Sequence, residues 1–179
     1  MEKRANAVKF KGNPLTLVGP QLKAGDRAPD FQAHRFTADK GLFGVTLVEA
    51  HGGKPTLFSV VPSLDTPVCS LQTQKFNKDL AALAGKVSSY TISVDLPFAQ
   101  NRFCGDPAHK IDQLISLSDY QNRSFGQAYG VLIDELKILS RSIFVLGKDG
   151  KIVYCEYVPE VTQEPNYEKA LAALQAAVA

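Results

Sequence analysis

Residues 56–69 of the chain read TLFSVVPSLDTPVC, in which a mostly apolar segment leads through a short loop into the start of a helix. The apolar part, residues 56–61, is typical of a strand that is covered on both faces of a sheet. Thr66 can act as the N-cap of the helix, and Pro67 occupies the first helical position, where its missing N–H does no harm. Apolar residues then follow helical spacing as far as Gly85, which is expected to end the run.

Strands alternate with helices along most of the chain, which indicates an α/β fold with a mixed central sheet flanked by helices. The sheet is expected to be mixed because Gly and Asp at residues 147–150 favour a hairpin, which forces an antiparallel pair. A second hairpin signal, an N-terminal β-hairpin, surrounds Gly12 and Asn13. Strands are predicted at residues 7–11, 14–18, 46–49, 56–61, 87–95, 114–117, 142–146 and 152–158, and helices at 66–85, 97–103, 124–129 and from Pro165 onward.

Composition places the chain among ordinary globular proteins. Its 179 residues suggest one domain, since domains hold about 150 residues. A net charge of +2 is too small to indicate a nucleic-acid partner. No segment resembles a signal peptide, and none has the roughly 18 apolar residues that a membrane span needs, so we expect a cytoplasmic protein without membrane insertion.

The three cysteines, Cys69, Cys104 and Cys155, form neither a disulfide scaffold nor a C-x-x-C pair. Cys69 falls in the first turn of the predicted helix, where free backbone N–H groups and the helix dipole favour a thiolate. The alternative is that Cys69 is a small buried hydrophobic residue. Cys104 is expected at a helix end and could be an inert thiol, while Arg141, before an apolar strand, could form a surface ion pair.

The segment around Cys69 resembles the Pro-x-x-x-Thr-x-x-Cys signature of the peroxiredoxins, which are thiol-dependent peroxidases with a thioredoxin-like fold. Its residues fall on Pro62, Thr66 and Cys69. The resemblance extends to the bacterial thiol peroxidase branch, with its atypical two-cysteine mechanism, and runs from Val8 to the C-terminus. It rests on segments 12–14, 63–66, 102–105, 127–131 and 164–167.

The resemblance implies a role for each of these residues. Cys69 corresponds to the cysteine that attacks hydrogen peroxide or an organic hydroperoxide, with lipid-type substrates favoured, and becomes a sulfenic acid. Cys104 corresponds to the resolving cysteine, which forms an intrachain disulfide with Cys69. Thr66 and Arg141 correspond to residues that hydrogen-bond the thiolate and the peroxide, and Pro62 shields the site.

The resemblance further implies recycling by thioredoxin, a homodimer, and no metal or organic cofactor. Residues 8–179 are expected to form one thioredoxin-like peroxiredoxin domain, preceded by an N-terminal extension, residues 1–7. Cys155 matches no family role and is expected to be a buried structural thiol.

Two other functions remain open at this point. A redox sensor would pass the same disulfide to a partner protein instead of turning over. A disulfide oxidoreductase would need a C-x-x-C pair, which the residues after Cys69 do not supply. Without the resemblance, Arg102 and Arg123 compete with Arg141 for the role of the peroxide-binding arginine.

Overall fold

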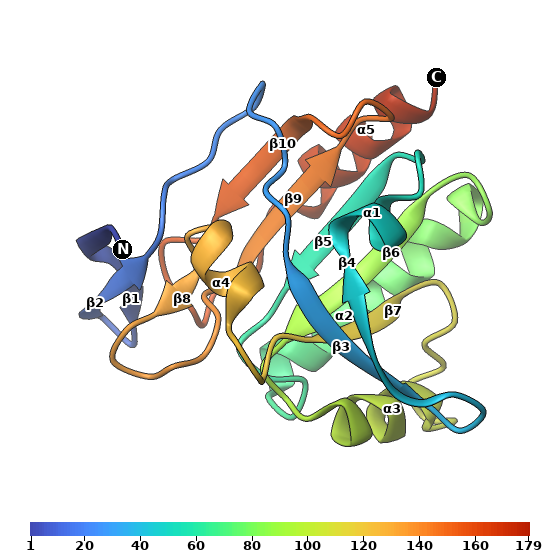
Figure 1. The fold of residues 1–179 in the computed structure, drawn as a ribbon, viewed down its shortest axis with the longest axis horizontal. Coiled ribbons are helices and arrows are strands. Elements are labelled where there is room, and N and C mark those ends of the chain that lie inside the picture. Colours follow the sequence, from blue (N-terminus) through green and yellow to red (C-terminus); the bar gives the residue numbers. More distant parts are fainter.

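The computed structural model describes residues 1–179 and has a seven-stranded mixed sheet with helices on both faces (Figure 1). The order of its strands is β10-β9-β5-β6-β7-β3-β4, and a second sheet has the order β1-β2-β8. The strands are β1 (Lys3–Phe10), β2 (Asn13–Val18), β3 (Gln32–Thr37), β4 (Gly41–Thr46), β5 (Thr56–Val60), β6 (Ser88–Ser93), β7 (Ile115–Ser118), β8 (Leu132–Ile133), β9 (Ser142–Leu146) and β10 (Ile152–Tyr157). The helices are α1 (Leu47–His51), α2 (Pro67–Leu80), α3 (Pro97–Gly105), α4 (Ser124–Ala128) and α5 (Tyr167–Val178), with a 3₁₀ turn at Ala81–Leu83.

The centre of the large sheet is parallel and its sides are antiparallel. β5, β6 and β7 run in the same direction, whereas β9 pairs antiparallel with β5, and β10 with β9. β3 joins β7 through a single residue pair, His34 with Ser118, and then continues into a hairpin with β4. The predicted mixed sheet and its C-terminal hairpin are therefore confirmed.

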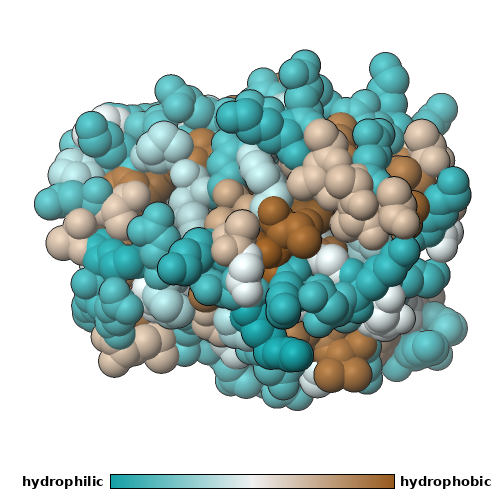
Figure 2. All heavy atoms as spheres, turned by 90° about the horizontal axis from the view of Figure 1, so that it is seen from above, coloured by the Kyte–Doolittle hydropathy of each residue, from teal (hydrophilic) through white to brown (hydrophobic).

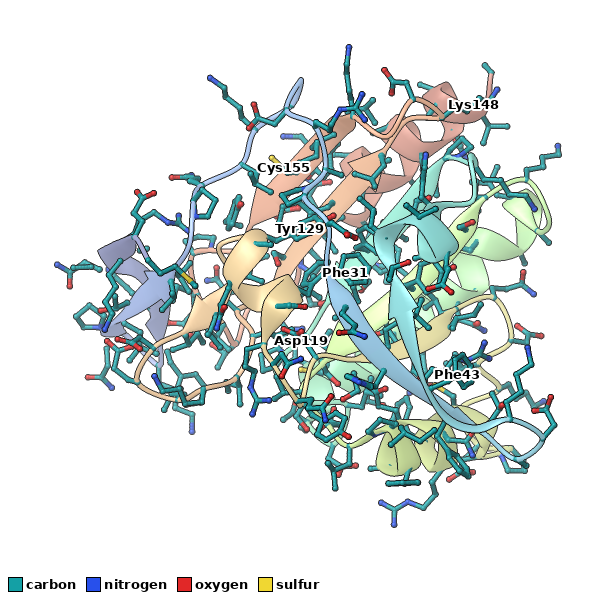
Figure 3. All side chains as sticks on the ribbon, in the orientation of Figure 1. Phe31, Phe43, Asp119, Tyr129, Lys148 and Cys155 are labelled. Atoms are coloured by element: carbon teal, nitrogen blue, oxygen red, sulfur yellow. The ribbon has the colours of Figure 1, made fainter.

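The two faces of the sheet have separate apolar cores. One face packs on α2 and α5 through residues such as Leu57, Phe76 and Leu174. The opposite face packs on α1 and α4 and is rich in aromatic rings. Phe31 and Tyr129, labelled in Figure 3, belong to this aromatic group, and their ring centroids lie 6.1 Å apart. Because β5 is buried on both faces, the loop that follows it starts from a rigid support.

The local structure differs from the predictions at three places. The strand predicted at residues 46–49 is not there: Thr46 ends β4 and caps α1 in a capping box with Glu49, whose carboxylate accepts the Thr46 N–H at 2.8 Å. The β3–β4 hairpin was missed. β1 begins at Lys3, four residues before the predicted strand, because the pairing register shifts between Arg4 and Val8 and interrupts the alternation.

The expected division after residue 7 falls within β1, and as a division of the chain it remains a prediction. The surface seen in Figure 2 is mostly hydrophilic, with apolar side chains in separate patches. None of the helices combines the length and the apolar character that crossing a membrane requires.

Candidate active site

Cys69 lies in the first turn of α2, directly beyond the carboxyl end of β5. The predicted helix start is confirmed: Thr66 has an extended backbone at the N-cap and Pro67 is the first helical residue. The Ser70 N–H donates to the Thr66 carbonyl at 2.9 Å, which closes the first turn. The Cys69 side chain is 0% exposed, so its sulfur lies beneath the surface at the positive end of the helix.

Arg141, just before β9, donates a hydrogen bond to this sulfur. Its Nη2 lies 3.3 Å from Cys69 Sγ. Nη1 donates to Gln72 Oε1 at 2.6 Å, and Nε donates to the Val161 carbonyl at 3.0 Å. Arg141 is only 2% exposed and has no carboxylate within ion-pair distance, so the surface ion pair considered above is excluded. The guanidinium is thus held in one orientation against the sulfur.

Neither of the two competing arginines donates a hydrogen bond to the Cys69 sulfur. Arg102 is exposed on α3. Arg123 donates to the carbonyls of Lys137 and Asp119, each at 3.2 Å.

Gln72 is a site residue that the sequence reasoning missed. It is 0% exposed, one turn after Cys69 on α2, and its Nε2 donates to Ser59 Oγ of β5 at 2.8 Å. Its amide therefore links the Arg141 guanidinium to the central strand. A polar residue three positions after Cys69, on the same face of the helix, is the signal that could have found it.

Thr66 is exposed and its hydroxyl donates to the Ser63 carbonyl at 3.1 Å. No hydrogen bond joins the Thr66 side chain to Cys69 in this conformation. Pro62 is buried two residues beyond the end of β5. A cavity of about 280 Å³ borders the helix start and is lined by Leu64, Asp65, Thr66, Pro67, Ser70, Phe103 and His109.

Cys104 lies near the end of α3 and is half-buried. It packs against the apolar cluster of Val61, Leu64, Cys69 and Phe103, so the fold brings both cysteine segments to one cluster. Both thiols are free. Burial raises the pKa of the Cys104 thiol, against the opposing effects of the Ser116 hydroxyl and the Arg35 charge.

Cys155 belongs to a different part of the molecule. It lies on β10, half-buried rather than buried, and its Sγ is 3.4 Å from the Leu22 carbonyl. Burial raises the pKa of this thiol. No group of three or more His, Cys, Asp or Glu residues is placed to hold a metal ion.

Comparisons with known proteins find relatives that match this chain over nearly its full length. Residues 23–171 match the Redoxin family model. The chain is 51% identical over 171 residues to the thiol peroxidase of Bacillus subtilis, an alignment that covers 96% of this chain and 98% of the relative. It is 49% identical over 170 residues to the thiol peroxidase of Listeria innocua, covering 95% and 98% of the two chains.

Solved structures also resemble this fold over nearly the whole chain. A peroxiredoxin-like protein from Aquifex aeolicus is 40% identical, with a TM-score of 0.82 over 97% of this chain and 98% of that one. A thiol peroxidase from Chromobacterium violaceum is 21% identical, with a TM-score of 0.78 over 94% and 95%. The expected thioredoxin-like fold is confirmed.

Proposed function

The chain belongs to the redoxin family, as a thiol peroxidase of the peroxiredoxin type, and from this premise we propose that Cys69 and Cys104 reduce hydroperoxides with electrons from thioredoxin. A thiol-dependent peroxidase activity is supported by the sequence, which is 51% and 49% identical to two thiol peroxidases over nearly their whole length. The observation that carries the assignment to Cys69 is the 3.3 Å contact between its sulfur and the buried Arg141 guanidinium.

In the first step, the Cys69 thiolate attacks the terminal oxygen of the hydroperoxide. A sulfur–oxygen bond forms and the peroxide O–O bond breaks, so that sulfur is oxidised and the peroxide is reduced. The leaving alkoxide or hydroxide takes a proton and departs as alcohol or water, and Cys69 becomes a sulfenic acid. Arg141 stabilises the attacking thiolate and the negative charge that develops on the peroxide oxygens. A donor positioned in this way contributes about 100- to 1,000-fold in rate.

In the second step, the Cys104 thiol attacks the Cys69 sulfenic acid. The sulfur–sulfur bond forms, the sulfur–oxygen bond breaks, and water leaves. The shared apolar cluster supports this pairing because it keeps the two segments next to each other. A disulfide needs Cα atoms within about 7 Å of one another. Cys69 lies in the first turn of α2 and Cys104 in the last turn of α3, so the proposal includes unwinding of both turns to let the two sulfurs meet.

In the third step, the dithiol of thioredoxin reduces the disulfide and restores both thiols. The chain has no C-x-x-C pair of its own, which fits an external dithiol as the electron source. A cytoplasmic location fits this cycle, since thioredoxin keeps cysteines reduced there. A homodimer is also part of the proposal and rests on the family resemblance.

The deciding experiment is a coupled assay with thioredoxin, thioredoxin reductase and NADPH. The wild type should consume NADPH with hydrogen peroxide and with an organic hydroperoxide, and the comparison identifies the preferred substrate. Sustained turnover would distinguish the peroxidase from a redox sensor.

Cys69→Ser should abolish turnover without unfolding the chain, because a serine hydroxyl is essentially never ionised at pH 7. Cys104→Ser should consume one equivalent of peroxide and then stop in this assay, and Cys155→Ser is the matched control with unchanged turnover. Residual activity of Cys69→Ser above one-tenth of wild type would refute the assignment.

A further inference from the structure

The Asp95 carboxylate, just beyond β6, holds the loop that precedes Cys69. Its Oδ1 accepts a hydrogen bond from Ser63 Oγ at 2.7 Å, and its Oδ2 accepts one from the Leu64 N–H at 2.8 Å. Ser63 and Leu64 lie between β5 and α2, and the Ser63 carbonyl in turn accepts the Thr66 hydroxyl. Asp95 therefore fixes the path of the chain into the helix that carries Cys69.

The same carboxylate is connected to α3, the helix that carries Cys104. Ser93 Oγ donates to Asp95 Oδ2 at 2.7 Å, and Gln100 Nε2 donates to Ser93 Oγ at 2.9 Å. Gln100 is 1% exposed and lies one helical turn before Cys104. Two chains of hydrogen bonds therefore end on the carboxylate. The loop arm consists of the direct donors Ser63 and Leu64, and the α3 arm runs from Gln100 through the Ser93 hydroxyl.

Asp95 is the carboxylate on which this hydrogen-bond network converges. No lysine or arginine forms a salt bridge with Asp95, so its carboxylate is satisfied by neutral donors from the loop before Cys69 and from β6, and it reaches α3 only through Ser93. Hydrogen bonds to a charged acceptor are roughly twice as strong as those between neutral groups. Asparagine at this position would thus weaken both arms at nearly unchanged side-chain size, because it removes the charge and replaces one of the two accepting oxygens with a donor.

The hydrogen bonds of the α3 arm are less completely satisfied than those of the loop arm. Gln100 donates to Ser93 and to the Leu117 carbonyl, but its own Oε1 is buried without a partner. An unsatisfied buried acceptor regains a hydrogen bond once it reaches water, which favours release of the segment. The arm to α3 therefore opens more easily than the arm to the Cys69 loop.

We propose that Asp95 is a positioning residue that locks both cysteine segments in the reduced protein and thereby sets the balance between disulfide formation and over-oxidation of Cys69. The proposal rests on the proposed function of Cys69 and Cys104. The weaker arm releases α3 first, so Cys104 becomes mobile while the Cys69 site is still assembled.

Two reactions compete for the Cys69 sulfenate. Attack by the Cys104 thiol gives the disulfide and water, and it requires release of the α3 arm. Attack by the sulfenate on a second hydroperoxide forms another sulfur–oxygen bond, breaks another O–O bond, and yields a sulfinic acid and an alcohol. The second reaction uses the assembled site, so a tighter network favours the sulfinic acid and a looser one favours the disulfide.

Asp95→Asn and Gln100→Met separate the two arms in single-turnover reactions, with products quenched, alkylated and weighed by mass spectrometry. Asp95→Asn should slow Cys69 oxidation at least tenfold and lower the sulfinic fraction at least threefold, at a peroxide concentration that over-oxidises half of the wild type. Gln100→Met should leave Cys69 oxidation within twofold of wild type and speed disulfide formation at least threefold.

Asp119→Asn is the matched control. Asp119 is a buried carboxylate that, like the half-buried Asp95, accepts hydrogen bonds, from the Phe125 and Gly126 N–H groups at 3.0 and 2.8 Å, but it holds α4 and neither cysteine segment. The Asp119→Asn variant should have a lower melting temperature, with the rates of Cys69 oxidation and of disulfide formation within twofold of wild type. This outcome separates a positioning role of Asp95 from a general loss of stability.

The proposal is overturned if folded Asp95→Asn and Gln100→Met leave the oxidation rate, the disulfide rate and the sulfinic fraction within twofold of wild type. If Asp95→Asn does not fold, Ser63→Ala removes one hydrogen bond of the loop arm and should slow Cys69 oxidation at least threefold; no change would overturn the proposal equally. A wild type that forms no Cys69–Cys104 disulfide refutes the proposed function itself, whereas a wild type that forms it beside unaffected variants refutes only the role of Asp95.

Discussion

Arg141 is a buried positive charge without a carboxylate partner. Its three donor atoms bind a carbonyl, an amide oxygen and the Cys69 sulfur. Burying an unpaired charge is costly, and among these three acceptors only the sulfur can become an anion. The proposed function requires a thiolate at Cys69, and a thiolate there would offset the cost of burying the Arg141 charge.

Arg141→Ala should lower the rate constant for peroxide reduction at least 100-fold without unfolding the chain. Arg141→Lys should recover only part of this loss, because an ammonium group cannot reproduce the planar arrangement of the guanidinium donors. Stopped-flow peroxide consumption measures both variants. Arg102→Ala, at an exposed position, is the control, and an effect of Arg141→Ala below fivefold would refute the role of Arg141.

At the scale of elements, the N-terminal hairpin supports the site from a distance. The Val161 N–H donates to the Lys9 carbonyl of β1 at 2.9 Å, and the Val161 carbonyl accepts Arg141 Nε. The neighbouring Glu160 carboxylate accepts the N–H groups of Lys11 and Gly12, each at 3.0 Å, in the turn of the hairpin. The hairpin thus anchors the segment that orients Arg141.

Glu160→Gln should destabilise the protein at pH 7 and much less at pH 3. The backbone N–H of Gly12, with those of Thr162 and Lys11, lowers the pKa of Glu160 from 4.5 to about 2. A carboxyl with a lowered pKa in the folded state contributes stability above its unfolded pKa and loses it as the pH falls toward the folded value. Thermal unfolding of both proteins at the two pH values measures this, and an equal difference in melting temperature would contradict it.

Oxidation should change α2 and α3 more than any other helix. One equivalent of hydroperoxide is expected to join Cys69 to Cys104 within a chain, to leave Cys155 free, and to reduce amide protection in the first turn of α2 and the last turns of α3. Peptide mapping with hydrogen exchange tests both effects. A Cys69–Cys155 link, or a bridge only between chains, would refute the resolving role of Cys104.

For the whole molecule, the start of α3 offers an apolar surface next to the Cys104 segment. Leu96 and Phe98 are each 53% exposed, and the Phe98 ring lies 5.0 Å from that of Phe36 on β3. Exposed apolar groups of this kind are frequent at protein interfaces. This surface is a candidate contact for the homodimer that the family resemblance implies.

Sedimentation at micromolar concentration should therefore show a dimer, and Phe98→Glu should shift it toward the monomer because a charge would be buried in the contact. Val153→Glu, at another exposed apolar position, on β10, is the control. A wild type that sediments only near the chain mass of 19.4 kDa would contradict the dimer.

The start of α2 could be predicted from the sequence because its signals are local. A strand, a proline-bounded loop, an N-cap threonine and a proline at the first helical position all lie within residues 56–69. The same locality makes Cys69 a candidate nucleophile from the sequence alone, and the alternation of strands and helices is sufficient to predict the mixed sheet.

Except for Gln72, whose helical spacing from Cys69 is local, the groups that build the site come from distant parts of the chain and have no local sequence signal. Gln72, Asp95 and Val161 act through hydrogen bonds that exist only after β5, β6 and the segment beyond β10 have packed together. The β3–β4 hairpin was missed for a related reason: it lies at the edge of the sheet, with few buried residues to give it an apolar alternation. Helix caps, turns and the burial pattern of an element depend on residues that are neighbours in the sequence, so the sequence alone determines them. The partners of a buried charge depend on which remote residues the folded sheet brings together, so only the tertiary structure determines them.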